Sequence, residues 1–246
     1  MEERERLEAE NAARLEKIQK IQMRVDGLTP LNEVGTVSNA RHVWIDVNIT
    51  PKTSAGAEDP PVTKGRIIIE LFDDLLPEIT RIFSQMVRSD NPPTYKGTSF
   101  FSIIPGENCE AGSGRDRPAF GRALDNERAT LDAYHTTPGI VTLSDPSRDN
   151  IFSITFGECT KLDGRPPIGR VVYGVDVMHE IEQSGAANGK PTKSVVIQGG
   201  GDCDMSKGLS HYYKPMAVPV LRKADTGRMK IVGNRDVQAS HWLRRG

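Results

Sequence analysis

Polar side chains that could take part in binding or catalysis lie close together between residues 95 and 110, YKGTSFFSIIPGENCE. Ser102 interrupts an apolar run, and Glu107 and Glu110 follow it closely. An ionised carboxylate accepts hydrogen bonds and cannot donate them. These residue types therefore suit the binding of basic groups better than the stabilisation of a negative charge that develops during a reaction.

Motifs for metal, nucleotide or nucleophilic chemistry are weak in this sequence. Cys109, Cys159 and Cys203 have no metal-ligand spacing. The glycine run at 199–201 leads out of a predicted strand and does not open a helix, so it is no phosphate-binding loop. Sets of Ser, His and Asp can be composed from almost any chain, and we interpret His135 as structural. We expect no metal site and no cofactor.

Hydrophobic periodicity predicts a mainly β fold with two helices inside it. Residues 42–49 alternate as a strand, and residues 67–72 form a nearly continuous apolar run typical of a buried strand. Residues 75–88 have helical spacing, and residues 177–183 predict a second, shorter helix. Short strand-like runs separated by Gly, Pro and Asp fill the rest up to Asp202. Many short strands with few helices favour an antiparallel barrel.

Six segments follow one another in the order and spacing of a known family. They are GRIIIELFDDLLPEITRIF (65–83), YKGTSFFSIIPG (95–106), HTTPGIVTLS (135–144), IFSITF (151–156), LDGRPPIGRVVYGVDVMHEIE (162–182) and NGKPTKSVVIQGGGDC (188–203). From about Val43 to Cys203 the chain thereby resembles the cyclophilins, which are peptidyl-prolyl cis-trans isomerases. The resemblance implies an eight-stranded antiparallel β-barrel capped by two α-helices.

The resemblance also implies which residues would do the chemistry, and most of them are changed. The catalytic arginine position holds Ser102, and the histidine before it is Phe101. The catalytic positions that have degenerated are Phe101, Ser102, Glu110 and Asp145. The predicted peptide pocket keeps Phe152 and Leu162 and has changed residues at Glu107, Asn108, Ser144, Lys161 and Pro166.

These changes predict isomerase activity at or near background and weak cyclosporin binding. Two alternatives stay open. The barrel could be an active isomerase that assists folding, with Arg115, Arg117 or Arg122 swinging in as a substitute. It could also be a module that binds proline peptides without turnover, in which Phe152 accepts the proline ring.

Two extensions flank the predicted barrel, which gives a helical extension and linker at 1–40, a cyclophilin-like domain at 41–204 and a basic extension at 205–246. Residues 2–25 are strong helix formers without Gly or Pro. Their apolar stripe consists of Leu7, Leu15, Ile18, Ile21 and Val25. The stripe belongs to a solvated helix, to one docked on its own barrel, or to a helix that binds another protein.

The C-terminal extension carries nine basic and only two acidic residues over 205–246. Its aromatic and terminal basic residues are Tyr212, Tyr213, Trp242, Arg244 and Arg245. They could lie on an acidic protein surface, track the phosphates of RNA, or aid solubility alone. We interpret the chain first as a structural or adaptor subunit of a larger assembly, with protein partners held by both extensions.

Composition places the chain among ordinary globular proteins, at 37% hydrophobic and 26% charged residues in 246. No run is long enough for a transmembrane helix, and we expect no membrane partner. The acidic N-terminus lacks the apolar core of a secretory signal. With three cysteines that cannot all pair, a reducing compartment fits best, either the cytoplasm, including its cytoskeleton or axoneme, or the nucleus.

Overall fold

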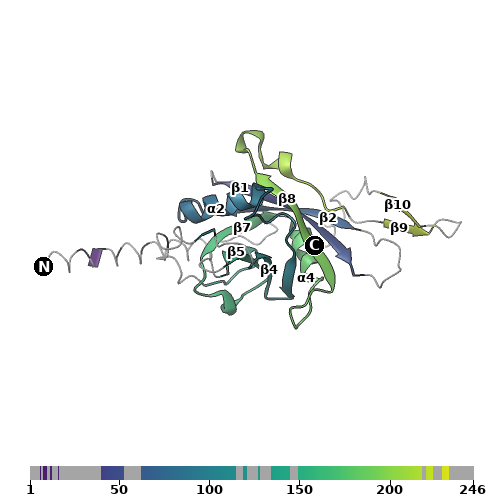
Figure 1. Cartoon of the computed structure of the whole chain (residues 1–246), viewed down its shortest axis with the longest axis horizontal. Coiled ribbons are helices and arrows are strands. Elements are labelled where there is room, and N and C mark those ends of the chain that lie inside the picture. Colours follow the sequence, from purple (N-terminus) through teal and green to yellow (C-terminus); the bar gives the residue numbers. More distant parts are fainter. Residues whose placement is uncertain are drawn as a thin grey trace, which may run out of the picture.

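The structure is a computed structural model of the whole chain (Figure 1). It describes residues 6, 8–9, 12, 16, 40–52, 62–114, 119–120, 127, 134–144, 149–217, 220–223 and 229–232. The apolar stripe from Leu7 to Val25 lies outside the described residues, as do Asp145, Trp242, Arg244 and Arg245. Within the described residues, no helix has the length and apolar character needed to cross a membrane.

Eight antiparallel strands form one sheet that closes almost completely into a barrel, as predicted. In chain order they are β1 (His42–Pro51), β2 (Thr63–Leu71), β3 (Phe100–Ile104), β4 (Asn108–Ser113), β5 (Ile140–Leu143), β6 (Asn150–Thr155), β7 (Pro167–Tyr173) and β8 (Lys193–Asp202). Their order across the sheet is β3-β4-β6-β5-β7-β2-β1-β8. The end strands meet where Ser99 bridges Val196 and the amide of Ile197 donates to the carbonyl of Thr98 at 2.9 Å.

The barrel interior is filled by the inward-facing side chains that the period-two pattern predicts. In β1 the alternating residues Val43, Ile45, Val47 and Ile49 are all at most 2% exposed. Because successive side chains of a strand point to opposite faces, the residues between them lie on the outer face of the sheet. This alternation decides which polar side chains are free to make contacts outside the barrel.

Two helices cover the barrel, α2 (Pro77–Arg88) and α4 (Val175–Glu182) (Figure 1). α2 begins with Pro77, which lacks an amide hydrogen and suits the first helical turn. The Glu127 carboxylate accepts from the amides of Glu78 and Ile79 at 2.9 and 3.1 Å. A residue distant in sequence therefore supplies the acceptors that the start of α2 needs.

The chain continues past the predicted boundary at residue 204 and packs on its own barrel. Residues 205–217, the C-terminal strap, contain the 3₁₀ turns η3 (Met205–Lys207) and η4 (Leu209–Tyr212). Leu209 is buried, and the ring of Tyr213 stacks on that of Tyr173 with centroids 4.2 Å apart. Strands β9 (Val220–Lys223) and β10 (Met229–Val232) then pair as a hairpin. The sequence pattern predicted neither the turns nor the hairpin.

Candidate functional site

Four polar side chains lie in one register row across β3, β4, β6 and β5. Ser102 pairs with Glu110, Glu110 with Ser153, and Ser153 with Thr142. We call these residues the outer row, because the apolar core lies on the other face of the same strands. The Ser153 hydroxyl donates to the Glu110 carboxylate at 3.4 Å. Ser153 and Thr142 are fully buried, so the accessible members of the row are Ser102 and Glu110, a hydroxyl and a carboxylate with no guanidinium.

The neighbouring register row is apolar and faces the barrel interior. It consists of Phe100, Ala111, Phe152 and Leu143, each at most 1% exposed. The ring of Phe152 contacts Tyr95, Phe83 and Phe100 at centroid distances of 4.8, 5.5 and 6.2 Å. The expectation that Phe152 lines a peptide pocket beside Ser102 is therefore wrong in this structure. Residues on opposite faces of a sheet cannot line the same surface.

Two predicted pocket positions are joined by an ion pair. The Lys161 ammonium lies 2.6 Å from the Glu107 carboxylate, between η2 (Thr160–Leu162) and the turn before β4. Both side chains are substantially exposed. The hydrogen bond from Lys161, with the negative charge of Glu107, raises the pKa of the lysine. Two of the predicted pocket positions therefore hold paired charges in place of apolar side chains.

An arginine that sequence comparison did not single out lies over the outer row. The Arg165 guanidinium is 3.6 Å from the Glu110 carboxylate and 3.4 Å from the Ser144 hydroxyl. The Arg165 guanidinium therefore has two acceptors on this face, the Glu110 carboxylate and the Ser144 hydroxyl. Arg115, Arg117 and Arg122, which we weighed as substitutes for the catalytic arginine, lie outside the described residues.

The remaining predicted pocket residues are mostly structural. Asn108 is 5% exposed, and its side-chain oxygen lies 3.8 Å from the Cys159 sulfur. Leu162 is 2% exposed. Pro166 is buried, and its carbonyl accepts from the Thr142 hydroxyl at 2.8 Å. These three residues are buried, which leaves little of them for a ligand to contact.

Phe101, which the resemblance places at the family's histidine position, precedes Ser102 in β3 and is exposed. The pairing of β3 with β4 shifts register between Phe100 and Ser102, so Phe101 is the extra residue of a bulge. Its ring is 44% exposed, an unusual environment for an aromatic side chain in a barrel strand. The bulge leaves Phe101 without a paired residue on β4.

The cysteines are poor nucleophiles in this fold. Burial raises the pKa of Cys109 far above the ordinary thiol range and that of Cys203 to about 11. Burial likewise raises the pKa of Cys159. Because the thiolate is the reactive form, these thiols are inert at neutral pH. Among the described residues, no group of three or more His, Cys, Asp or Glu side chains could hold a metal ion.

A family model described as cyclophilin type peptidyl-prolyl cis-trans isomerase/CLD matches residues 59–201, which is more than half of the chain. The chain belongs to the cyclophilin family. The match includes every strand of the barrel except β1 and the last residue of β8, together with both helices. It therefore covers all of the outer row and the Lys161–Glu107 ion pair.

Two residues of this cyclophilin face were not found by comparing positions with the family pattern. Ser153 follows the retained Phe152, and alternation along β6 could have placed it beside Glu110. Arg165 comes from the loop before β7, and no local pattern indicates that it reaches Glu110 and Ser144. Loop side chains are placed by tertiary contacts, so only the structure brings these groups together.

Proposed function

We propose that this cyclophilin-family chain is a non-catalytic protein-binding module that serves as a structural or adaptor subunit of a larger assembly. The observation that carries the proposal is the chemistry of the outer row. Ser102 and Glu110 stand where an isomerase needs an arginine and a neutral hydrogen-bond donor. The flanking positions hold the Lys161–Glu107 ion pair instead of apolar side chains.

The isomerase reaction makes demands that these residues do not meet. Rotation about an X–Pro bond faces a barrier of about 18–20 kcal/mol. An enzyme lowers it by gripping the proline ring and aiming preorganised donors at the twisted amide, each worth about 10²–10³ in rate. Glu107 and Glu110 are acceptors only. Ser102 can donate, but its hydroxyl carries no positive charge.

The burial of Phe152 also weakens the alternative of a proline-peptide module. That alternative needs an aromatic wall on the outer face, and Phe152 packs in the core against Tyr95 and Phe83. A protein-binding role remains supported by the two extensions, which lie outside the family match at residues 59–201. The exposed ring of Phe101 adds an apolar contact point on the surface.

One experiment tests the catalytic half of the proposal. The full-length protein is mixed with an Ala-Pro tetrapeptide, and cis–trans exchange is measured by NMR. We expect exchange at the uncatalysed rate. An exchange rate at least about tenfold above that of a peptide-only control would overturn the proposal.

A second experiment tests the adaptor half. The tagged full-length protein is sized in a gentle cell extract beside variants that lack residues 1–39 or 218–246. We expect the full-length protein in a large particle and at least one truncated variant outside it. Migration of all three as free monomers would remove the adaptor role.

Arg165 supports a second candidate, an isomerase with a relocated guanidinium. Its Nη1 atom lies on the outer face, 3.4 Å from the Ser144 hydroxyl. If the tetrapeptide exchange is accelerated, Arg165→Ala should abolish the acceleration. Arg41→Ala is the matched control, because Arg41 precedes β1 and belongs to a different part of the barrel.

A further inference from the structure

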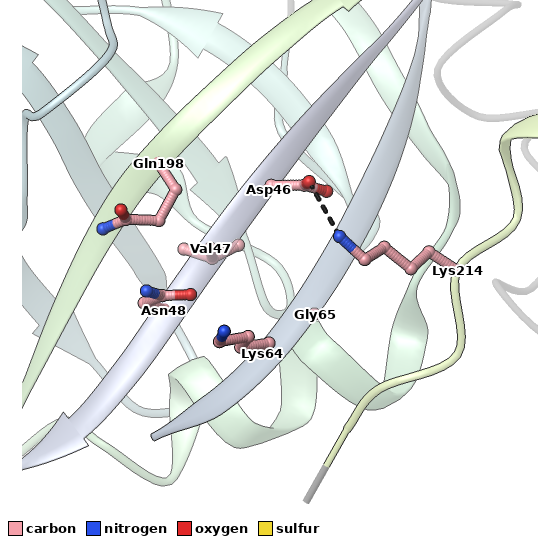
Figure 2. A pocket seen from close by; sticks show the side chains of 7 residues that line it. All are labelled: Asp46, Val47, Asn48, Lys64, Gly65, Gln198 and Lys214. Carbon is pink, nitrogen blue, oxygen red and sulfur yellow. Dashed lines mark hydrogen bonds and ion pairs between the residues drawn. The ribbon is translucent and has the colours of Figure 1, made fainter. Parts of the chain in front are cut away.

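A pocket of about 210 Å³ lies on the outer face of β1, β2 and β8, apart from the outer row (Figure 2). Its lining residues are Asp46, Val47, Asn48, Lys64, Gly65, Gln198 and Lys214. Six of them come from the three strands. Lys214 reaches in from the C-terminal strap (Figure 2). The pocket therefore depends on a segment that follows the family match.

Register explains why polar side chains converge here. Asn48 pairs directly with Lys64 across β1 and β2, on the face opposite the buried Val47. The pairing of β1 with β8 skips Gln198, which makes that residue the extra one of a β-bulge. A bulge re-aims a side chain, and Gln198 thereby joins Asn48 at the pocket. A Cβ added at the adjacent Gly199 would meet no atom within 4 Å, so this side is open.

Several contacts hold the C-terminal strap at the pocket. The rings of Tyr213 and Tyr173 are nearly parallel, at 3°, and Arg66 donates to the Tyr212 carbonyl at 3.2 Å. The strap then adds to the exposed end of β2, where Lys64 and Ala217 exchange backbone hydrogen bonds of 2.7 and 3.1 Å. These contacts place the Lys214 ammonium 3.1 Å from the Asp46 carboxylate.

The pocket carries more positive charge than its single carboxylate can neutralise. Asp46 already receives two hydrogen bonds from the Arg66 guanidinium, at 2.6 and 2.9 Å. Lys214 is therefore the second cation on the same carboxylate, whose one negative charge cannot neutralise both. Within the described part of the chain, the side chains of Lys64, Asn48 and Gln198 have no hydrogen-bond or ion-pair partner. Two ammonium groups and two side-chain amides are therefore placed to receive an anion.

We propose that this pocket binds carboxylate side chains of an acidic protein segment, and that the C-terminal strap completes it. The inference deepens the proposed adaptor role, on which it rests, by giving the partner's chemistry. The volume is below the range of about 300–1,000 Å³ of drug-sized ligand sites, so it suits one or two side chains.

RNA fits this face less well than an acidic protein segment. Single-stranded RNA binds basic grooves through bases stacked on free aromatic faces. The Tyr213 ring is occupied by Tyr173 at 4.2 Å, and the Trp44 ring is covered by Arg66 at 4.0 Å. The aromatic rings beside the pocket are thus used by the fold.

The test uses full-length protein and a fluorescein-labelled peptide of alternating Glu and Ser, read by fluorescence anisotropy at low salt. The Lys64→Glu variant should raise the dissociation constant about fivefold or more, because a favourable ion pair becomes a repulsion. Arg81→Glu on the exposed face of α2 makes the same change in net charge and should alter the dissociation constant by less than about twofold. Equal effects of the two variants, or no binding of the peptide, would overturn the proposal.

The role of the strap is tested separately. Tyr213→Ala removes the ring stack and should weaken peptide binding as much as Lys64→Glu does, whereas Tyr213→Phe should retain it. Unchanged binding in Tyr213→Ala would exclude the strap from the site. The same assay is run with an oligouridylate of equal charge. If the oligouridylate binds wild type more tightly than the peptide does, and Lys64→Glu abolishes its binding, the partner is RNA and the proposed acidic protein segment is wrong. Because the probe lacks proline, isomerase activity in the exchange assay would refute the non-catalytic role and leave this result standing.

Discussion

Lys161 and Glu107 form an ion pair at 2.6 Å although they lie 54 positions apart in the chain. Both are predicted pocket positions at which the sequence departs from the cyclophilin pattern, and their charges compensate one another. An isolated lysine or glutamate at these positions would present an uncompensated charge at the predicted peptide site. The pair makes this part of the surface polar, with one positive and one negative group in contact.

Restoring the arginine alone should not restore catalysis. We expect Ser102→Arg to leave proline exchange within about twofold of background, because the new guanidinium would meet the Glu110 carboxylate beside it. The measurement is NMR exchange on an Ala-Pro tetrapeptide. A variant that combines Ser102→Arg with Glu107→Phe, Glu110→Gln and Lys161→Trp serves as the comparison, and it should exceed the single variant about tenfold or more. Full activity in the single variant would show that Ser102 is the sole defect.

Phe152 should behave as a core residue. We expect Phe152→Ala to lower the free energy of unfolding by about 3–5 kcal/mol, because it removes a ring packed against Tyr95, Phe83 and Phe100. Urea denaturation followed by far-UV circular dichroism measures the change. The neighbouring Ser153→Ala on the outer row should cost about 1 kcal/mol or less. A Phe152→Ala protein as stable as wild type would place the ring outside the core.

The Glu127 carboxylate should stabilise α2. It accepts from two amides at the start of the helix, so Glu127→Ala should cost about 1–2 kcal/mol of unfolding free energy. Glu127→Gln keeps one acceptor and should lie between the alanine variant and wild type. Hydrogen exchange at the Glu78 and Ile79 amides gives a local readout. Unchanged protection of both amides in Glu127→Ala would contradict the contact.

Asp46 should make stability depend on pH in the acid range. Burial acts to raise the pKa of Asp46, but hydrogen bonds from Arg66 and Lys214 outweigh it and lower the pKa below its ordinary value. The folded state therefore favours the ionised carboxylate. Its contribution is complete above the unfolded pKa of about 3.9 and is lost as the pH falls through the lower folded value.

We therefore expect Asp46→Asn to be less stable than wild type by about 1–2 kcal/mol at neutral pH. The difference should narrow as the pH falls well below about 3.9. Urea denaturation at a series of pH values measures it. Asp90→Asn, which removes a more exposed partner of Lys96, is the control and should change stability little throughout. A difference that is constant with pH would show that the Asp46 charge does not stabilise the fold.

Local pattern was enough to predict most of the barrel. The alternation from Val43 to Ile49 predicts a strand and the spacing from Leu75 to Arg88 predicts a helix. In both, most of the predicted apolar positions are buried in the structure. The prediction that Ser102 stands at the arginine position likewise rests on local pattern, because the surrounding string keeps its spacing. These features are set by residues close to one another in the sequence, so the local sequence pattern is enough to predict them.

The sequence by itself determined the family, the barrel and the polar character of residues 102–110. Only the tertiary structure decided that Phe152 faces inward, that Arg165 reaches Glu110, and that the strap brings Lys214 to Asp46. The physical reason is that strand register and long-range packing set these relationships. A shift of one residue reverses the face of a side chain, and a bulge such as that at Gln198 makes such a shift without a clear signal in the sequence.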